Sequence, residues 1–354
     1  MKRLQTITYS IIALLLFGSM ISCEQNEDPI VETPPAEEGL IEVNGGGATF
    51  PNTVFISLRK EEQFAVGRTK WDLAFSANSD FKVLINGTTG AMAYETDEVD
   101  INAVGETQAE PLRTAGELEL TFNNMNSILY VDHTQNPLLE PVLGTVSAVD
   151  AENKVFILNR GSSGTDARPW KKIRILRKDG KYLVQHADIT ATTFTSIEVA
   201  KDPKLNLVYL SFEDGLVTVE PEKPNWDFAW TAGTSSTLFP QAVNGTLAYF
   251  FQDLVYHNIY GGVSAVQVLE SEIAYDNFDE LDIATLTFNS DNRLTVGSTW
   301  RSGGGPNAAP AIRNDRYYIL KDANGNYYKV RFLSLTKNGE RGRPSFEYAL
   351  VKAG

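Results

Sequence analysis

The chain has 354 residues, of which 45 are acidic and 31 are basic, so its formal net charge at pH 7 is −14. A surface with this excess of negative charge repels nucleic acid and anionic lipid headgroups, which excludes nucleic acid as a partner. Its single cysteine excludes an intramolecular disulfide, and its three histidines leave few candidate groups for acid–base catalysis at neutral pH.

The chain begins with a pattern typical of a bacterial lipoprotein signal. Two basic residues precede the apolar run 11–17, and residues 19–22 resemble a lipobox that ends at Cys23. An apolar run this short marks a cleaved secretory signal rather than a membrane span. We therefore predict that residues 1–22 are a signal peptide and that Cys23 becomes the lipidated first residue of the mature protein. Ordinary cleavage beside an incidental cysteine is the alternative.

The segment that follows is predicted to be a disordered tether. Residues 23–39 are acidic, contain prolines and have almost no large apolar side chains. Such a segment cannot bury enough apolar surface to offset the entropy lost on ordering. An acidic stretch directly after the lipidated cysteine also resembles an export signal for the outer cell surface. We expect a protein that is lipid-anchored in the outer membrane and exposed at the cell surface, with the periplasmic face as the alternative.

Beyond the tether, short apolar or alternating runs rich in Val, Ile, Phe, Tyr and Thr predict an all-β fold. Examples are residues 54–58, 154–158, 208–212 and 327–335. Asn-Gly and Asp-Gly dipeptides between such runs supply the positive φ angles that tight hairpins require. The clearest predicted hairpin covers residues 317–332, with its turn at Asn324-Gly325.

Similar sequence blocks occur twice in the same order. Residues 71–75 (WDLAF) return as residues 226–230 (WDFAW), about 155 residues later. Further pairs of blocks are 54–62 with 208–215, 86–94 with 244–249, 159–164 with 300–305, and 175–182 with 319–327. This spacing matches a whole domain rather than one unit of a solenoid. We predict two tandem domains, residues 40–198 and residues 199–354.

The repeated Trp-Asp pair is expected to be structural. A large ring at Trp71 or Trp226 anchors a sheet, and the adjoining Asp72 or Asp227 points to the opposite face, where it accepts hydrogen bonds from backbone or Arg. No partner carboxylate or histidine recurs at a fixed offset in both copies. The chain also lacks the spacing of a serine triad, a zinc-protease motif or a phosphate loop, so we predict that it is not an enzyme.

The order of these blocks behind a lipobox resembles the HmuY family of Bacteroidetes lipoproteins. The resemblance covers residues 40–354, once in each copy, and is better in the second copy. It implies an all-β fold in which long hairpins grip a ligand, and capture of haem or a related tetrapyrrole for uptake, with an outer-membrane receptor as a partner. Haem is then a ligand and not a catalytic cofactor. The alternative is a non-haem binding module on the same duplicated scaffold, for a peptide, a glycan or an outer-membrane partner.

The resemblance also indicates where iron ligands would lie. Haem-binding members hold iron between two side chains, usually His or Met, and one of them comes from a Gly/Pro-rich loop before the final hairpin. At that loop this chain has Arg160 in the first copy and Arg301 in the second. A guanidinium group cannot ligate iron, but it can pair with a carboxylate of the ligand.

The remaining candidates are few. His133 and Met125 are candidate iron ligands in the first copy, although each also fits an ordinary loop residue. In the second copy, Tyr256, His257 and Tyr260 form an aromatic cluster that could sandwich a planar ring. Neither copy contains a complete pair of iron ligands. We expect any tetrapyrrole to be held weakly, by aromatic stacking and Arg–carboxylate contacts.

Overall fold

The computed structural model describes residues 34–164, 166–303 and 309–354. The predicted signal peptide, Cys23 and most of the predicted tether lie outside these residues. Residues 35–354 form one structural unit. Within the described residues, no helix has the length and apolarity that a membrane span requires.

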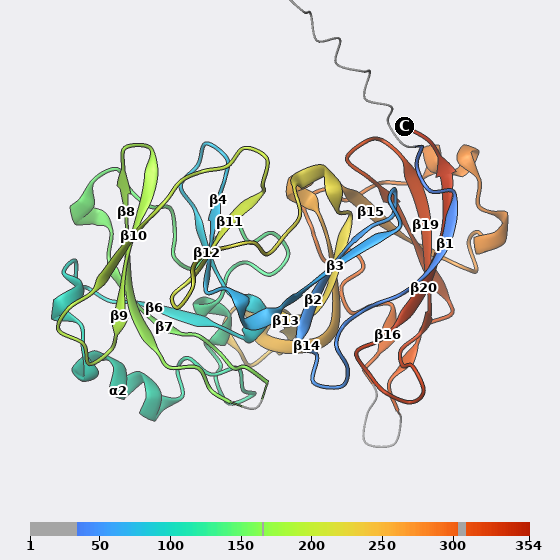
Figure 1. Ribbon diagram of the computed structural model, residues 1–354. Coiled ribbons are helices and arrows are strands. Elements are labelled where there is room, and N and C mark those ends of the chain that lie inside the picture. The colour runs from blue at the N-terminus through green and yellow to red at the C-terminus, as the bar shows by residue number, and fades with distance from the viewer. Residues whose placement is uncertain (1–33, 165, 304–308) are drawn as a thin grey trace, which may run out of the picture. The chain divides into compact units, whose positions relative to one another are not determined.

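The fold is all-β, as predicted, and two five-stranded sheets lie at opposite sides of Figure 1. One sheet has the order β10-β9-β8-β7-β6 and contains β6 (Met92–Glu95), β7 (Val155–Asn159), β8 (Lys171–Lys178), β9 (Lys181–Asp188) and β10 (Thr195–Val199). The other has the order β1-β20-β19-β18-β15 and contains β1 (Glu38–Glu42), β15 (Ser264–Leu269), β18 (Arg316–Lys321), β19 (Tyr327–Ser334) and β20 (Ser345–Lys352). β1 begins inside the segment predicted as tether, because its backbone pairs with β20.

Two four-stranded central sheets lie between them. The first contains β4 (Leu73–Ser76), β5 (Val83–Ile85), β11 (Leu207–Ser211) and β12 (Gly215–Val217). The second contains β2 (Asn52–Ser57), β3 (Glu62–Gly67), β13 (Phe228–Leu238) and β14 (Thr246–His257).

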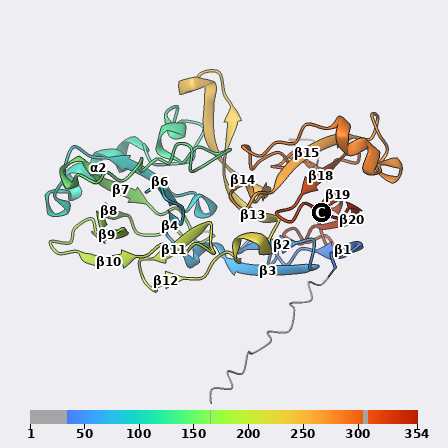
Figure 2. The ribbon, with the colours of Figure 1, turned by 90° about the horizontal axis from the view of Figure 1, so that it is seen from above.

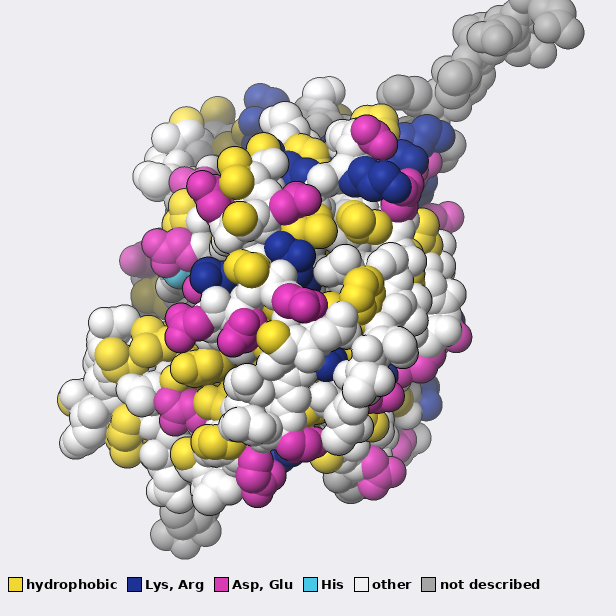
Figure 3. Space-filling model, turned by 90° about the vertical axis from the view of Figure 1, so that its left-hand side faces the viewer, with side chains coloured by type: hydrophobic (Ala, Val, Ile, Leu, Met, Phe, Trp, Pro, Cys, Tyr) yellow, Lys and Arg dark blue, Asp and Glu magenta, His cyan; other side chains and the backbone are white. Residues whose placement is uncertain are grey.

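The remaining elements are short. β16 (Arg301–Ser302) and β17 (Ala311–Ile312) pair with each other, and α2 spans Glu106–Ala115. The 3₁₀ helices are η1 (Arg68–Lys70), η2 (Gly87–Thr89), η3 (Ile101–Ala103), η4 (Ser127–Tyr130), η5 (Asp150–Glu152), η6 (Lys223–Asn225), η7 (Val243–Gly245), η8 (Ile259–Gly261), η9 (Tyr275–Asn277) and η10 (Glu280–Thr285). Acidic side chains are scattered among hydrophobic and basic ones over the face that includes β8–β10 (Figure 3), in keeping with the net negative charge.

The central sheets exchange hairpins across the predicted domain boundary. The hairpin β2–β3 pairs with β13, with Ile56 opposite Phe228. The hairpin β11–β12 pairs with β4, with Leu210 opposite Leu73. Each central sheet therefore contains strands from both predicted domains, and the boundary between residues 198 and 199 does not separate two sets of paired strands. The strands that make up each central sheet are determined by their backbone hydrogen bonds and not by their order along the chain.

The two aspartates of the Trp-Asp blocks fasten these exchanges in the same way. The Oδ2 atom of Asp72 accepts a hydrogen bond from the Phe212 N–H at 2.8 Å, and that of Asp227 accepts one from the Leu58 N–H at 2.6 Å. Each acceptor and donor lie on opposite sides of the predicted boundary. The adjoining tryptophans are buried. The predicted structural role of the Trp-Asp pair is confirmed.

The turn at Asn86 has its structural counterpart at Asn258, not at Asn244 as the sequence match suggested. The Asn86 side-chain amide donates to the Trp71 carbonyl at 2.7 Å, and that of Asn258 donates to the Trp226 carbonyl at 3.0 Å. Asn244 instead lies in η7, between β13 and β14. The hairpin β13–β14 is much longer than β4–β5 and projects beyond the neighbouring sheets (Figure 2). The block 244–249, which matches 86–94 in sequence, therefore begins at the tip of this hairpin.

We predict that residues 203–354 do not fold stably without the first hairpin. The fragment lacks Val54, Ile56 and Leu58, which are fully buried against the second half of the chain. Each such side chain contributes about 1.5–3 kcal/mol on burial, so their loss removes much of a typical domain stability of about 5–15 kcal/mol. Thermal unfolding followed by circular dichroism should show a cooperative transition for residues 34–354 and none for the fragment. Adding residues 34–70 in trans should restore it, whereas a cooperative transition of the fragment alone would contradict the exchange.

Candidate functional site

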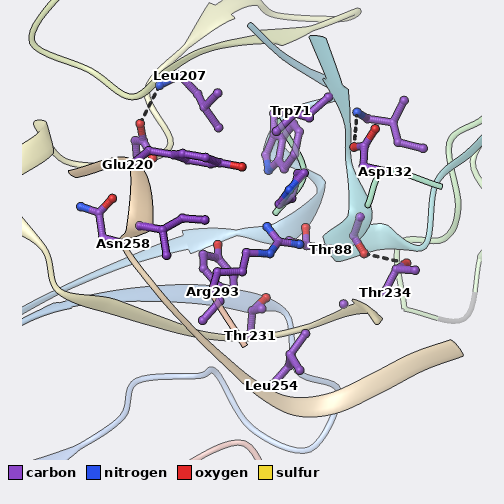
Figure 4. A pocket seen from close by; sticks show the side chains of 18 of the residues that line it. Trp71, Thr88, Asp132, Leu207, Glu220, Thr231, Thr234, Leu254, Asn258 and Arg293 are labelled. Carbon is purple, nitrogen blue, oxygen red and sulfur yellow. Dashed lines mark hydrogen bonds between the residues drawn. The ribbon is translucent and has the colours of Figure 1, made fainter. Parts of the chain in front are cut away.

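A small central cavity is lined by residues of both central sheets and of the turns at Asn86 and Asn258 (Figure 4). Leu84 of β5 lines it from one sheet, Leu254 of β14 lines it from the other, and Trp71 lines it from the segment between η1 and β4. Its volume is about 90 Å³. Because the hairpin exchange places these segments side by side, both halves of the chain build the cavity.

Two carboxyl groups belong to the cavity wall, of which Glu220 is buried and Asp132 is half-buried. Glu220 accepts hydrogen bonds from the N–H groups of Asn206 and Leu207, at 3.1 and 2.9 Å, and from the Tyr209 hydroxyl at 3.2 Å. Asp132 accepts two other backbone N–H groups, at 3.0 and 2.9 Å. Burial raises the pKa of each carboxyl to about 7, against the opposing effect of these hydrogen bonds.

The lining also contains the nitrogen-bearing side chains of Arg293, Trp226 and His257. The Nε of Arg293 donates to the Thr134 carbonyl at 3.0 Å, and its guanidinium carbon lies 5.0 Å from the centre of the Tyr256 ring. Trp226 Nε1 and His257 Nδ1 are buried and have no hydrogen-bond partner among the described residues. Burial lowers the pKa of His257 to about 4, so the ring is neutral at pH 7.

The structure brings the predicted aromatic cluster together but leaves no room for a macrocycle there. Tyr256, His257 and Tyr260 all line the central cavity. The Tyr260 hydroxyl accepts from the Leu138 N–H at 2.8 Å and donates to Asn136 at 3.0 Å, which fixes the ring. A volume of about 90 Å³ is far below the roughly 300–1,000 Å³ of pockets that enclose larger ligands. The cluster therefore does not sandwich a tetrapyrrole in this conformation.

The two predicted iron ligands do not converge. His133 lines an open groove of about 510 Å³ that shares Val131 and Asp132 with the central cavity and does not include Met125. The His133 Nδ1 accepts a hydrogen bond from the Asn136 N–H at 3.1 Å. The proton of the neutral ring is therefore on Nε2, which leaves no lone pair there for a metal. Met125 is exposed, and its carbonyl accepts a hydrogen bond from the Val243 N–H.

Arg160 is buried and its carboxylate partners belong to the protein itself. Its Nε lies 2.7 Å from Asp72 Oδ1 and its Nη2 lies 3.0 Å from Oδ2, a bidentate pair. Glu213 accepts a further bond from Nη2 at 2.7 Å, and Arg168 also contacts Asp72. Arg160 thus pairs with Asp72 rather than with a ligand carboxylate, which leaves this guanidinium little capacity for a ligand.

Arg301 is buried in a different setting. Its Nε lies 3.6 Å from Asp253, and its Nη2 donates to the Gln252 carbonyl. It lines a shallow pocket of about 300 Å³ together with Arg313 and Arg316. The two arginines that occupy matching loops in the sequence therefore have different partners.

Sequence reasoning missed two open grooves beside Phe250 of β14, which we call the Phe250 grooves. One has a volume of about 550 Å³ and is lined by residues that include Arg113 and Trp170. The other, of about 580 Å³, includes Arg68. Ser162 and Phe250 line both. The Gly-rich loop 159–164 was the sequence feature that could have indicated these grooves. Its position beside Phe250, however, depends on the hairpin β13–β14, which belongs to the other half of the chain.

Neither Phe250 groove offers the usual iron ligands. Among the described residues, no His, Met or Cys lines either groove. The Arg113 guanidinium lies 4.9 Å from the centre of the Trp170 ring, and the Arg68 guanidinium lies 5.7 Å from the centre of the Phe250 ring. Within the described part of the chain, no cluster of three or more His, Cys, Asp or Glu side chains could hold a metal ion.

We predict that Glu220→Gln removes part of the pH dependence of stability. The folded pKa of about 7 lies above the ordinary value of 4.5, so the folded state binds more protons between these values and stability falls as pH rises through that window. Gln mimics the protonated acid. The variant should match the parent within about 1 kcal/mol at pH 5 and exceed it by about 2–3 kcal/mol at pH 8 in urea unfolding.

The matched control is Glu222→Gln, whose side chain is 48% exposed beside Lys204. It should leave the pH profile unchanged. Identical pH profiles for the parent and Glu220→Gln would show that the Glu220 carboxyl ionises in the folded state as it does in the unfolded chain.

Comparison with known proteins gives a match in the second part of the chain. No curated protein matches the sequence. Similar solved structures include the apo HmuY analog of Tannerella forsythia, with 9% identity, a TM-score of 0.31, and coverage of 91% of this chain and 99% of that chain. Apo PinO of Porphyromonas gingivitis has 9% identity, a TM-score of 0.25, and coverage of 90% and 100%. The family match does not extend to the predicted first copy, which stays a prediction. Residues 203–348 match the HmuY protein family.

Proposed function

We propose that this chain is a lipid-anchored binding protein of the outer cell surface that captures haem or a related tetrapyrrole for uptake, without a pair of iron ligands. The match of residues 203–348 to the HmuY family supports a binding protein rather than an enzyme. The observation that carries the proposal is the pair of Phe250 grooves, which have the size of ligand pockets and aromatic and guanidinium linings.

The chemistry of the grooves suits a flat, apolar ring that bears carboxylates. Trp170 and Phe250 offer aromatic surface for stacking. Arg113 is held by Glu106 and Glu110 of its own helix, and its side chain is 34% exposed. A partly exposed ion pair of this kind contributes only about 0–1 kcal/mol, so a ligand carboxylate can replace one of its partners at little cost.

Iron is not expected to contribute to this binding. The imidazole of His133 lines an open groove, but a metal at its Nε2 would displace the proton that the Asn136 N–H bond keeps there. Binding that rests on stacking and charge should be weak and should not depend on the metal.

We predict that haemin and metal-free protoporphyrin IX bind with affinities within about threefold of each other, and without a sharp low-spin Soret band, in absorbance and fluorescence titrations. Phe250→Ala should weaken both about tenfold, because it removes roughly 1–1.5 kcal/mol of aromatic contact. His133→Ala and the control Phe122→Ala, at a side chain 54% exposed outside both grooves, should change neither.

Two results would overturn this proposal. Much tighter binding of haemin, with a low-spin spectrum that His133→Ala abolishes, would mean that iron is ligated after all. Failure of both macrocycles to bind saturably would favour the alternative, a non-haem binding module on the same scaffold.

We predict that Cys23 carries lipid. In cells labelled with a fatty-acid analogue, the parent protein should be labelled and fractionate with the outer membrane, because two or three acyl chains contribute about 0.8 kcal/mol for each buried CH₂. Cys23→Ala should be unlabelled, and surface proteolysis of intact cells should cleave the parent. An unlabelled parent protein would refute the lipid anchor.

A further inference from the structure

We infer that the central cavity is a second binding site, separate from the Phe250 grooves, and that its ligand is a short-chain aliphatic carboxylate. The inference does not depend on tetrapyrrole binding, because the central cavity and the Phe250 grooves share no described lining residue.

The first observation is that unpaired polar atoms belong to residues that line this cavity. Trp226 is 4% exposed and His257 is 1% exposed, and neither Trp226 Nε1 nor His257 Nδ1 has a hydrogen-bond partner among the described residues. An indole N–H can only donate, so it calls for an acceptor. The His257 Nε2 lies 3.3 Å from the Asn289 carbonyl and donates to it in the neutral ring, so Nδ1 is an acceptor that a carboxylate does not satisfy. The unpaired donor is therefore Trp226 Nε1, whereas more than nine in ten buried polar groups in proteins have a partner.

The second observation concerns charge. Arg293 is half-buried and extends its guanidinium toward Thr88 inside the cavity (Figure 4). Only its Nε has a described acceptor, the Thr134 carbonyl, and no ion pair joins Arg293 to a described carboxylate. The two acids of the wall, Asp132 and Glu220, accept backbone N–H groups. Burial raises the pKa of Asp132, and the charge of Arg293 lowers it to a smaller extent without a direct ion pair. A ligand carboxylate would match the remaining guanidinium N–H groups in bidentate geometry.

The third observation is size. The cavity has a volume of about 90 Å³, whereas a protein cavity of roughly 150 Å³ accommodates benzene. A carboxylate with a body of one to a few carbons fits, and an aromatic acid does not. Leu84, Leu207 and Leu254 give the apolar surface that such a body needs. Tyr256, Tyr260 and Arg293 are only half-buried, so entry is on their side of the cavity.

The test uses the full mature chain and sodium propionate as the probe. In ¹H–¹⁵N NMR spectra, propionate should shift the Trp226 indole N–H resonance saturably, with a Kd in the millimolar range or tighter. Propionamide, of equal size but uncharged, and benzoate, which is too large, should bind at least tenfold more weakly. Arg293→Gln should weaken propionate binding at least tenfold, and Arg293→Lys should have an intermediate effect.

Arg316→Gln, at an arginine outside the cavity, and Trp170→Phe are the matched controls and should leave the propionate affinity unchanged. The comparison of propionate with propionamide in the unmodified chain keeps the test valid if an Arg293 variant fails to fold. Equal binding of the two probes, no shift of the Trp226 resonance, or a high-resolution structure grown with propionate that holds only water between Trp226 and Arg293 would overturn the inference.

Discussion

The structure depends on the exchange of two hairpins, one from each half of the chain. β13 pairs with β2, and β4 pairs with β11, so neither half completes its central sheet alone. Asp72 and Asp227 lock the exchange by accepting backbone N–H groups from the other half. A buried carboxylate that satisfies a backbone donor is costly to displace, which ties the two halves into one unit. Both proposed binding sites are consequences of this arrangement.

The two Trp-Asp blocks have different surroundings in the two halves of the chain. Asp72 is paired with Arg160 and Arg168, whereas burial raises the pKa of Asp227 to about 7. The long hairpin β13–β14 brings Phe250 against the loop 159–164 of the other half and thereby forms the Phe250 grooves. The arginines at the loops expected to hold iron ligands, Arg160 and Arg301, contact aspartates of the chain itself.

The local features of the fold were predictable, and the long-range ones were not. Residues 317–332 predicted a hairpin, and β18 and β19 form it around Asn324-Gly325. The Trp-Asp blocks likewise gave their structural role correctly. The pairing partners of β2 and β11 could not be predicted from the sequence, because the two strands have the same apolar pattern and either hairpin fits either central sheet. The central cavity combines residues from 71 to 293, so no local motif marks it.

Native-state hydrogen exchange of the whole chain tests the interlocked architecture most directly. Peptides that cover β2, β4, β11 and β13 should open together, with one free energy equal to that of global unfolding, because each strand is bonded to the other half. Loss of protection in β2–β3 at low denaturant, or separate opening of residues 71–199 and 226–354, would contradict the exchange as the feature on which the fold depends.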